Sequence, residues 1–282
     1  FRPDVLIAHG FSEHLWGRYA GLLAGVPYLV HVEHNTRERY TRWRLAQARW
    51  LATRTARIVG CSEGVRLRLL ELGFPAARVM AIDNGINLAP FATVGTQPIV
   101  ERDPSILMVA RFARQKDHAT LLRAIALLRA RGLRPPVQLA GAGRDSHRQA
   151  VEALSRELGI EDQVQFLGVV RDIPQRLGNT RIAVLSTLYE GMPLALIEGM
   201  AAGCAVVGSR VPGVREIIQH GINGLLAEPR DPQSLADTLE SLLRDDTLAA
   251  GLGAEARRQA FEHYGLARMA DDYAAMIAQI VR

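Results

Sequence analysis

The strongest chemical signal in the sequence is a pair of glutamates, Glu190 and Glu198, that follows an apolar segment at residues 182–185. Gly191 allows a turn, and Pro193 suits a first helical position, so N–H groups at the helix start lack intrahelical partners. Glu198 falls just over one turn inside an otherwise apolar helix, where a carboxylate needs polar partners. The pair could hold hydroxyls at both ends of an elongated polar ligand. Alternatively, Glu198 pairs with an arginine, and Glu190 caps the helix at the protein surface.

Two cations, Arg111 and Lys116, follow a second apolar segment at residues 106–110. Ligands of open α/β sheets bind beyond the carboxyl ends of the strands, and free N–H groups at a helix start favour anions. The two side chains would therefore suit a diphosphate. Lys116 is the only lysine among 34 basic residues. Either this position requires a lysine that arginine cannot replace, or the lysine was retained there by chance. Solvated loop cations are the alternative for both.

A glycine turn, Gly141-Ala142-Gly143, follows a third apolar segment at residues 137–140. Glycine lets a ligand or another backbone approach closely, and it also makes tight turns. The turn lacks the third glycine of a dinucleotide-binding fingerprint.

These residues need a scaffold of strands and helices, and the sequence alternates between the two. Continuous apolar runs suit parallel strands buried on both faces. We predict strands at residues 4–8, 28–33, 57–60, 79–82, 106–110, 137–140, 164–166, 182–185 and 205–207. Segments of helical period predict helices at about 12–24, 37–55, 62–72, 117–131, 146–158, 194–202, 214–219, 232–243, 247–262 and 267–281. The alternation predicts doubly wound α/β sheets.

Glycine, proline and polar residues between Thr93 and Pro104 interrupt this pattern as a linker does, and we place the linker at 97–104. We therefore predict a Rossmann-like domain at 1–96 and a second one at 105–265. The helix at 266–282 is expected to return to the first domain. Because fewer strand segments precede the linker than follow it, the first domain is expected to be incomplete.

Composition favours a soluble, two-domain chain: 282 residues, 48% hydrophobic and 22% charged. The first residues have neither the sections of a signal peptide nor an initiator Met. Cys61 and Cys204 lie far apart in apolar surroundings, which favours buried thiols in a reducing compartment over a disulfide or a metal site. We therefore predict a cytoplasmic protein.

Arginines concentrate in one predicted helix: Arg37, Arg39, Arg42, Arg44, Arg49, Arg54 and Arg57. Trp43 and Trp50 lie seven residues apart and hence on nearly one face of that helix. An arginine-rich helix with indoles can rest on an anionic membrane surface. A solvated helix whose aromatic side chains pack into the domain is the alternative.

The glutamate spacing Glu190-x7-Glu198 resembles the signature of retaining glycosyltransferases of family 4, which have the two-domain GT-B fold. Ala110 stands where the family has glycine. Other segments that resemble family motifs are Asp83-Asn84-Gly85-Ile86, Val109-Ala110-Arg111 with Lys116, Gly141-Ala142-Gly143, Gly213-x-x-Glu216 and Asn223-Gly224. The resemblance covers nearly the whole chain and implies the GT-B fold.

The resemblance implies a role for each matched residue. Arg111 and Lys116 would neutralise the leaving diphosphate of a nucleoside-diphosphate sugar. Glu198 would accept hydrogen bonds from ribose hydroxyls, and Glu190 would meet the donor sugar. The other implied donor contacts are Gly141 for nucleotide approach, Val170 beside the base, and the backbone of Gly191, Met192, Pro193 and Leu194. Glu216 is expected to be a structural cap.

The family's first domain also contributes a histidine at a strand end. His34 matches it best because it follows the segment 28–33, while His31 and His9 remain further candidates. A packed or capping role is the alternative for His9. Family members begin with a strand and a glycine-rich loop, which the residues before Asp4 do not supply, so an N-terminally truncated member is expected.

The resemblance implies transfer with retention at the anomeric carbon. The arginine-rich helix leads to the hypothesis that the acceptor is a glycan or lipid-linked glycan at the inner face of the cell membrane, in polysaccharide biosynthesis. The sequence has no Asp-x-Asp pair, so we predict transfer without a metal ion. We also predict no cofactor and no nucleic-acid partner. A nucleotide-sugar 2-epimerase or sugar phosphorylase of the same fold is one alternative. A truncated, non-catalytic nucleotide-binding fragment is the other.

Overall fold

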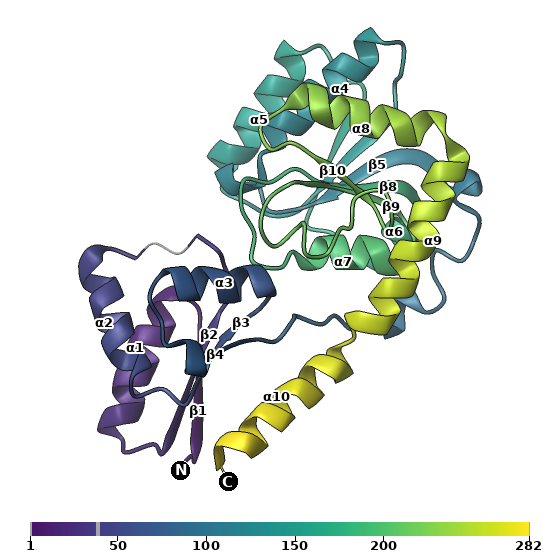
Figure 1. Ribbon diagram of the computed structural model, residues 1–282. Helices are drawn as coiled ribbons and strands as arrows, with labels where there is room; N and C mark the ends of the chain where they lie inside the picture. The colour runs from purple at the N-terminus through teal and green to yellow at the C-terminus, as the bar shows by residue number, and fades with distance from the viewer. Residues whose placement is uncertain (1, 38–39, 282) are drawn as a thin grey trace. The chain divides into compact units, whose positions relative to one another are not determined.

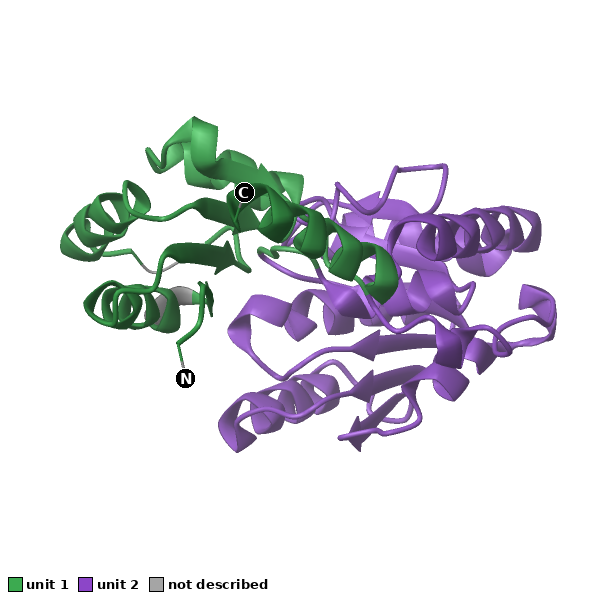
Figure 2. Cartoon of the chain, turned by 90° about the horizontal axis from the view of Figure 1, so that it is seen from below, with its two compact units in different colours: residues 1–85, 189–192, 266–282 green, residues 86–188, 193–265 purple. Residues whose placement is uncertain are grey.

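The computed structural model describes residues 2–37 and 40–281 and divides into two compact units, coloured separately in Figure 2. Unit 1 comprises residues 1–85, 189–192 and 266–282, and unit 2 comprises residues 86–188 and 193–265. The first division therefore falls at Gly85, before the boundary at residue 96 that the sequence predicts.

Two arginines explain why the expected linker belongs to unit 2. The buried guanidinium of Arg102 donates to the carbonyls of Gly95 and Ala202. Arg257 donates to the carbonyls of Phe91, Val94 and Ala201. These bonds attach residues 91–102 to the body of unit 2, so this segment is packed structure and not a free connection.

Unit 1 contains a four-stranded parallel sheet in chain order: β1 (Val5–His9), β2 (Tyr28–Glu33), β3 (Arg57–Gly60) and β4 (Val79–Ala81). The helices α1 (Phe11–Leu23), α2 (Arg42–Ala52) and α3 (Glu63–Glu71) connect successive strands. Right-handed crossovers that all step in one direction put their helices on one face of a sheet. Consistent with this, a Cβ added at Gly21 of α1 would meet Leu6 and Leu29 from the sheet.

The helix α10 (Leu266–Val281) covers the other face of this sheet (Figure 1). Alternate strand residues point to opposite faces, and Val30 and Val32, the neighbours of Leu29 and His31, form a buried cluster with Met276 of α10. Tyr273 and Ile277 pack against the same cluster. The last helix is thus a structural part of unit 1.

Unit 2 contains a six-stranded parallel sheet in the order β10-β9-β8-β5-β6-β7. Its strands are β5 (Asp103–Val109), β6 (Val137–Ala140), β7 (Val164–Gly168), β8 (Thr180–Leu185), β9 (Ala205–Ser209) and β10 (Leu225–Ala227). Its helices are α4 (His118–Ala130), α5 (Asp145–Glu157), α6 (Ile173–Asn179), α7 (Leu194–Ala201), α8 (Pro232–Arg244) and α9 (Asp246–His263). The chain winds from β5 outward to β7 and then returns to β8, which is the doubly wound arrangement that the sequence predicts.

Two predicted helices need correction. No helix forms at 214–219: residues 212–217 form consecutive turns, and the Gly213 N–H donates to the Glu216 carboxylate there. The arginine-rich helix begins at Arg42 and not at Arg37, with the Thr41 side chain capping its N-terminus; Arg39 lies outside the described residues. None of the described helices combines the length and the low polarity that a bilayer-crossing segment requires.

Candidate functional site

The two cations predicted to bind a diphosphate, Arg111 and Lys116, lie in the loop between β5 and α4 of unit 2. Arg111 is exposed and Lys116 is half-buried. Strand β5 pairs with β6 on one side and with β8 on the other. The chain reverses its direction of winding between β5 and β8, so the carboxyl ends of these two strands flank the topological switch point. Open α/β sheets bind ligands at such points.

The loop after β8 is hydrogen-bonded to the loop after β5. The carbonyl of Gln115 accepts from the Thr187 hydroxyl at 3.1 Å and from the Leu188 N–H at 2.9 Å. The Ser186 hydroxyl donates to the carbonyl of Asp117 at 3.1 Å. These bonds hold the backbone that carries Lys116, which lowers the cost of ordering it around a ligand.

Gly141 and Gly143 allow this loop to approach the end of β6. A Cβ at Gly141, whose φ is 153°, would lie 2.1 Å from the carbonyl oxygen of Ala110, and one at Gly143 would lie 2.6 Å from that of Phe112. The N–H groups of Ala110 and Phe112 donate to the carbonyls of Ala140 and Ala142. The close approach that requires these glycines is therefore one of backbone to backbone, and nucleotide approach at Gly141 stays a prediction.

Glu198 lies on α7, whose other inward residues, Leu196, Ile197 and Met200, are buried. Burial raises the pKa of the Glu198 carboxyl above its ordinary value. Within the part of the chain that the structure describes, its carboxylate has no hydrogen bond or ion pair, so the arginine partner of the alternative interpretation is not found there. A half-buried carboxylate without a partner is costly, which suits a residue that awaits a ligand.

The remaining unit 2 candidates occupy loop and helix-end positions. Pro193 is the N-cap residue of α7 and not its first helical residue, and no side chain caps this helix start. Leu194 is exposed, and Val170 is half-buried in the loop after β7. The N–H groups at the start of α7 thus have no capping side chain, as anion binding at a helix N-terminus requires.

The segment Tyr189–Met192 belongs to unit 1 and is held there by hydrogen bonds to its main chain. The Thr36 hydroxyl donates to the Glu190 carbonyl at 2.8 Å, and the Ser62 hydroxyl donates to the Gly191 carbonyl at 2.7 Å. A Cβ at Gly191 would lie 2.0 Å from the carbonyl oxygen of His34. Glu190 is 6% exposed. Unit 1 therefore brings His34 and the Glu190 segment together.

The side chains of His34 and His9 are also neighbours, with Nε2 of His34 3.0 Å from Nδ1 of His9 and stacked rings. Burial lowers the pKa of His9, and burial together with the charge of His9 lowers the pKa of His34. Both imidazoles are therefore neutral at pH 7, when each can donate one hydrogen bond and accept one. The backbone N–H of His34 donates to Oε1 of Glu33 at 2.9 Å.

His31, the other histidine candidate in β2, is fully buried and stacks on His14. Around it lies a polar network that the sequence analysis did not identify. The buried Arg18 guanidinium donates to Nδ1 of His14 at 2.7 Å, and Tyr40 bonds Nε2 of His14 and Oε2 of Glu33. The spacing of His14 and Arg18 at i and i+4 on one helix face was the available signal.

One group of three side chains in the described residues, His14, His31 and Glu33, has potential metal ligand atoms within 4.8 Å of one another. Both ring nitrogens of His14 are already hydrogen-bonded, one of them to the buried Arg18 guanidinium. A cation beside that guanidinium would be repelled. The group fits a structural network and not a metal.

Two parallel α/β units, the second with a switch point bordered by cations and a carboxylate, define the GT-B class of glycosyltransferase folds. Solved structures agree: the Anabaena protein HepE in complex with UDP and glucose superposes with a TM-score of 0.88 at 20% identity, over 98% of this chain and 78% of that chain. The profile "Glycosyl transferases group 1" matches residues 94–259, more than half of the chain, and "Glycosyltransferase Family 4" matches residues 1–90. The chain belongs to the glycosyl transferases group 1 family.

Two curated relatives illustrate the similarity. N-acetyl-alpha-D-glucosaminyl L-malate synthase of Bacillus anthracis is 33% identical over 129 residues, which cover 46% of this chain and 34% of that protein. UDP-Gal:alpha-D-GlcNAc-diphosphoundecaprenol alpha-1,3-galactosyltransferase of Escherichia coli is 25% identical over 261 residues, which cover 87% of this chain and 67% of that protein. The chain spans about a third of the first relative's length and about two thirds of the second's.

Proposed function

We propose that this chain carries the machinery of a retaining glycosyltransferase that moves a sugar from a nucleoside-diphosphate sugar to a glycan or lipid-linked acceptor. The observation that supports this most strongly is the placement of Arg111 and Lys116 after β5, at the switch point of the unit 2 sheet. The HepE structure contains UDP and glucose, and the family membership supports the same donor class for this chain.

The proposed chemistry centres on the leaving group. When the bond from the anomeric carbon to the diphosphate breaks, the nucleoside diphosphate takes up negative charge. Arg111, Lys116 and the uncapped N–H groups at the start of α7 would stabilise that charge, because fixed cations and helix N–H groups favour an anion without solvent reorganisation. These groups supply the charge that a divalent ion would otherwise supply, so we propose transfer without a metal or other cofactor.

Glu198 is proposed to accept hydrogen bonds from the ribose hydroxyls of the donor. Its raised pKa and its lack of a partner among the described residues support this role, because two hydroxyl donors would satisfy an otherwise costly carboxylate. Glu190 is proposed to meet the hydroxyls of the donor sugar. Neutral His34, oriented by His9, is proposed to hydrogen-bond the sugar without acting as a nucleophile.

Retention at the anomeric carbon is proposed by front-face attack, in which the acceptor hydroxyl attacks on the side that the diphosphate leaves. The acceptor proton then passes to the departing phosphate oxygen. No side chain needs to form a covalent bond to the sugar in this scheme.

The acceptor is proposed to lie at an anionic membrane surface. On α2 the indoles of Trp43 and Trp50 are 73% and 47% exposed, and the Arg54 guanidinium lies 3.8 Å from the centroid of the Trp50 ring. Trp50 stacks on Tyr19 of α1, so only part of the aromatic surface packs into unit 1. Exposed indoles among arginines suit the headgroup region of a bilayer. The Escherichia coli relative is named for a lipid-diphosphate acceptor.

Flotation with vesicles tests the membrane proposal. The chain should float with vesicles containing phosphatidylglycerol and not with neutral vesicles, and Trp43→Ala should weaken the association about tenfold. Equal flotation with neutral and anionic vesicles would contradict it.

Two measurements test the transferase proposal: binding of UDP- and GDP-sugars to the chain, and the slow rate at which the chain hydrolyses the bound donor. Hydrolysis should release nucleoside diphosphate, and Lys116→Ala or Glu190→Ala should slow it about a hundredfold or more, in line with the loss of one transition-state contact. Arg156→Ala, which removes an exposed arginine from α5, is the control and should leave the rate unchanged.

Other products would favour the alternative functions. Phosphate-dependent release of sugar phosphate would favour a phosphorylase, and a changed configuration of the donor sugar would favour an epimerase. Tight nucleotide binding without any turnover in a longer chain that contains this one would favour the non-catalytic alternative.

A further inference from the structure

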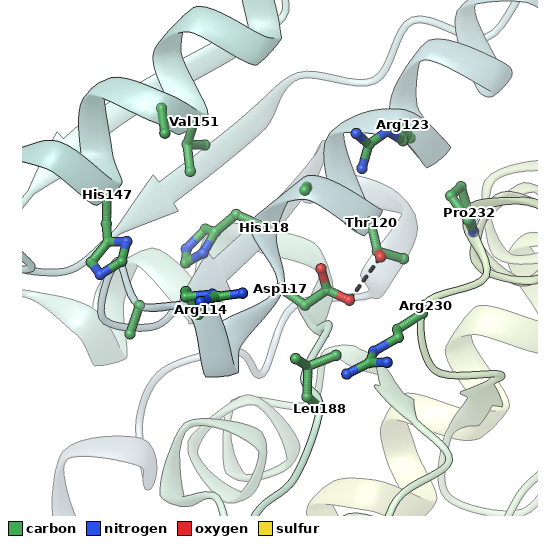
Figure 3. Close-up of a pocket in the computed structure, with 13 residues that line it drawn as sticks. Arg114, Asp117, His118, Thr120, Arg123, His147, Val151, Leu188, Arg230 and Pro232 are labelled. Carbon is green, nitrogen blue, oxygen red and sulfur yellow. Dashed lines mark hydrogen bonds between the residues drawn. The ribbon is translucent and has the colours of Figure 1, made fainter.

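A pocket of about 730 Å³ lies in unit 2 around the start of α4, between α5 and the N-terminus of α8. Figure 3 shows Arg114, Arg123 and Arg230 placed around Asp117 and Thr120. Each arginine comes from a different element: the 3-10 turn before α4, α4 itself and the loop before α8. The residues proposed above for the donor, including Arg111, Lys116 and Glu198, do not line this pocket.

The three guanidiniums share one pocket and have no partners among the described residues, whereas other exposed arginines without partners, such as Arg134 and Arg156, do not line it. Other arginines of unit 2, such as Arg129, Arg131 and Arg181, form ion pairs with acids. Arg114, Arg123 and Arg230 are exposed, and none of them forms a hydrogen bond or ion pair with a described residue. Three like charges around one hollow repel one another unless an anion enters. The sequence analysis did not identify these residues, because solvated loop arginines look the same in sequence.

Backbone strain concentrates at the same pocket. The described residues contain two non-glycine residues with positive φ, Asp117 at 34° and Arg230 at 62°, and both line it. Such conformations cost free energy and are kept where neighbouring structure or function requires them. At Arg230 the positive φ belongs to a turn that follows Pro229 and is closed by the Asp231 N–H, which donates to the Glu228 carbonyl.

The first turn of α4 adds hydrogen-bond donors to these charges. No side chain caps this helix, and the Thr120 hydroxyl donates to Oδ2 of Asp117 at 2.7 Å. The free N–H groups of a first turn favour anions. Asp117 opposes an anion, but it is one carboxylate against three guanidiniums. His118 stays neutral, because burial, aided by the Lys116 charge, lowers its pKa to about 4.

We propose that this pocket binds a diphosphate group through Arg114, Arg123 and Arg230, at a place separate from the donor residues. Guanidiniums bind phosphate oxygens with two parallel hydrogen bonds each, and three of them match the charge of a diphosphate. The group could come from a soluble phosphate compound or from a lipid headgroup, and both sources share this chemistry.

Calorimetric titration with inorganic pyrophosphate, with UDP already at saturation, tests the proposal. The whole chain should bind pyrophosphate, and the triple variant Arg114→Gln/Arg123→Gln/Arg230→Asn should bind it at least about a hundredfold more weakly. The control is Arg134→Gln/Arg156→Gln/Arg244→Gln, which removes the same charge from exposed positions outside the pocket and should keep the affinity. UDP binding should be equal in both variants, so failure of the donor proposal is seen separately.

Vesicles containing a polyprenyl diphosphate, a lipid whose headgroup is a diphosphate, form the second arm, and phosphatidylglycerol vesicles, whose headgroup has a single phosphate, are their control. Binding to the polyprenyl diphosphate vesicles but not to pyrophosphate, lost in the pocket variant alone, supports the site and identifies a headgroup as the source. Arg230→Gly adds an independent readout: glycine tolerates positive φ, so its melting temperature should equal or exceed that of the parent while pyrophosphate binding weakens about tenfold. The proposal is overturned if the pocket and control variants bind both probes equally, or if the parent chain binds neither.

Discussion

The two units use parallel sheets of similar construction but differ in strand order and in where particular polar groups lie. Unit 1 orders its strands in chain sequence, and its polar side chains turn inward, where His14, Arg18 and His31 are fully buried. Unit 2 reverses its winding at β5 and β8, and Arg111 and Arg114 stand exposed after β5. The order in which strands are wound decides where an open α/β sheet offers ligands a crevice, and the four strands of unit 1 contain no such reversal.

The buried network of unit 1 depends on neutral histidines. Burial, with the charges of His31 and Arg18, lowers the pKa of His14 far below its ordinary value. Burial also lowers the pKa of His31, with the Arg18 charge as the next cause, and it lowers the pKa of the Arg18 guanidinium to about 10. Neither His31 nitrogen makes a hydrogen bond to a described residue. This core therefore tolerates protonation poorly.

Mild acid should destabilise unit 1 more than unit 2, and this is the largest expected difference between them. Below pH 6.5 the unfolded chain binds protons at His14 and His31 while the native state does not, so the free energy of unfolding falls as pH falls. The loss is about 1.4 kcal/mol per pH unit for each buried histidine, or about 4 kcal/mol for the pair by pH 5. Hydrogen exchange read by segment should show protection of β1 to β4 falling faster than that of β5 to β9. Parallel loss in both sheets would contradict the comparison.

A substitution at Gly141 tests the close packing of the unit 2 loop. Gly141→Ala puts a Cβ 2.1 Å from the Ala110 oxygen and should lower the free energy of unfolding of unit 2 by about 2 to 3 kcal/mol. Gly251→Ala is the matched control, because nothing lies within 4 Å of its added Cβ and it sits within α9. It should be neutral or stabilising. Equal denaturation midpoints for the two variants would show that the loop can move away.

The smallest effect concerns Glu198. Its folded-state pKa is raised, so the native state binds more protons than the unfolded state between the two pKa values, and stability falls as pH rises through that interval. Glu198→Gln should therefore raise the unfolding free energy at pH 7 by about 1 kcal/mol, with the gain vanishing in acid, while nucleotide binding weakens. Thermal melts at pH 7 and pH 4 measure it. Destabilisation at pH 7 would show that the carboxylate has a structural partner.

Most of the elements could be predicted because their apolar periods are strong. Tyr28–Glu33, Arg57–Gly60 and Val137–Ala140 form strands at the predicted residues. The helix α6 was not predicted, since its seven residues carry too little periodicity, and the three-residue strand β10 was not predicted either. Residues 214–219 resemble a helix in composition, but the Glu216 carboxylate binds the Gly213 N–H and offers the backbone an alternative.

Residue type and position select Arg111, Lys116 and Glu198 from the sequence, and the structure has the first two in the loop after β5 and the third on α7. Their roles stay predictions. Other features depend on contacts between residues far apart in sequence, such as the bonds that attach Glu190 and Gly191 to Thr36 and Ser62. The unpaired state of Arg114, Arg123 and Arg230 is likewise a property of the fold, because whether an arginine meets an acid depends on tertiary neighbours.

The membership of α10 in unit 1 has a consequence for synthesis. Unit 2 is complete once residue 265 has left the ribosome, whereas the β1 to β4 sheet waits for Met276 and its neighbours to cover one apolar face. Domains generally fold as they emerge from the ribosome. Here the β1 to β4 sheet is synthesised before unit 2 but completes its folding after it. During translation the exposed face of Val30, Val32 and Val59 is the surface that chaperones would meet.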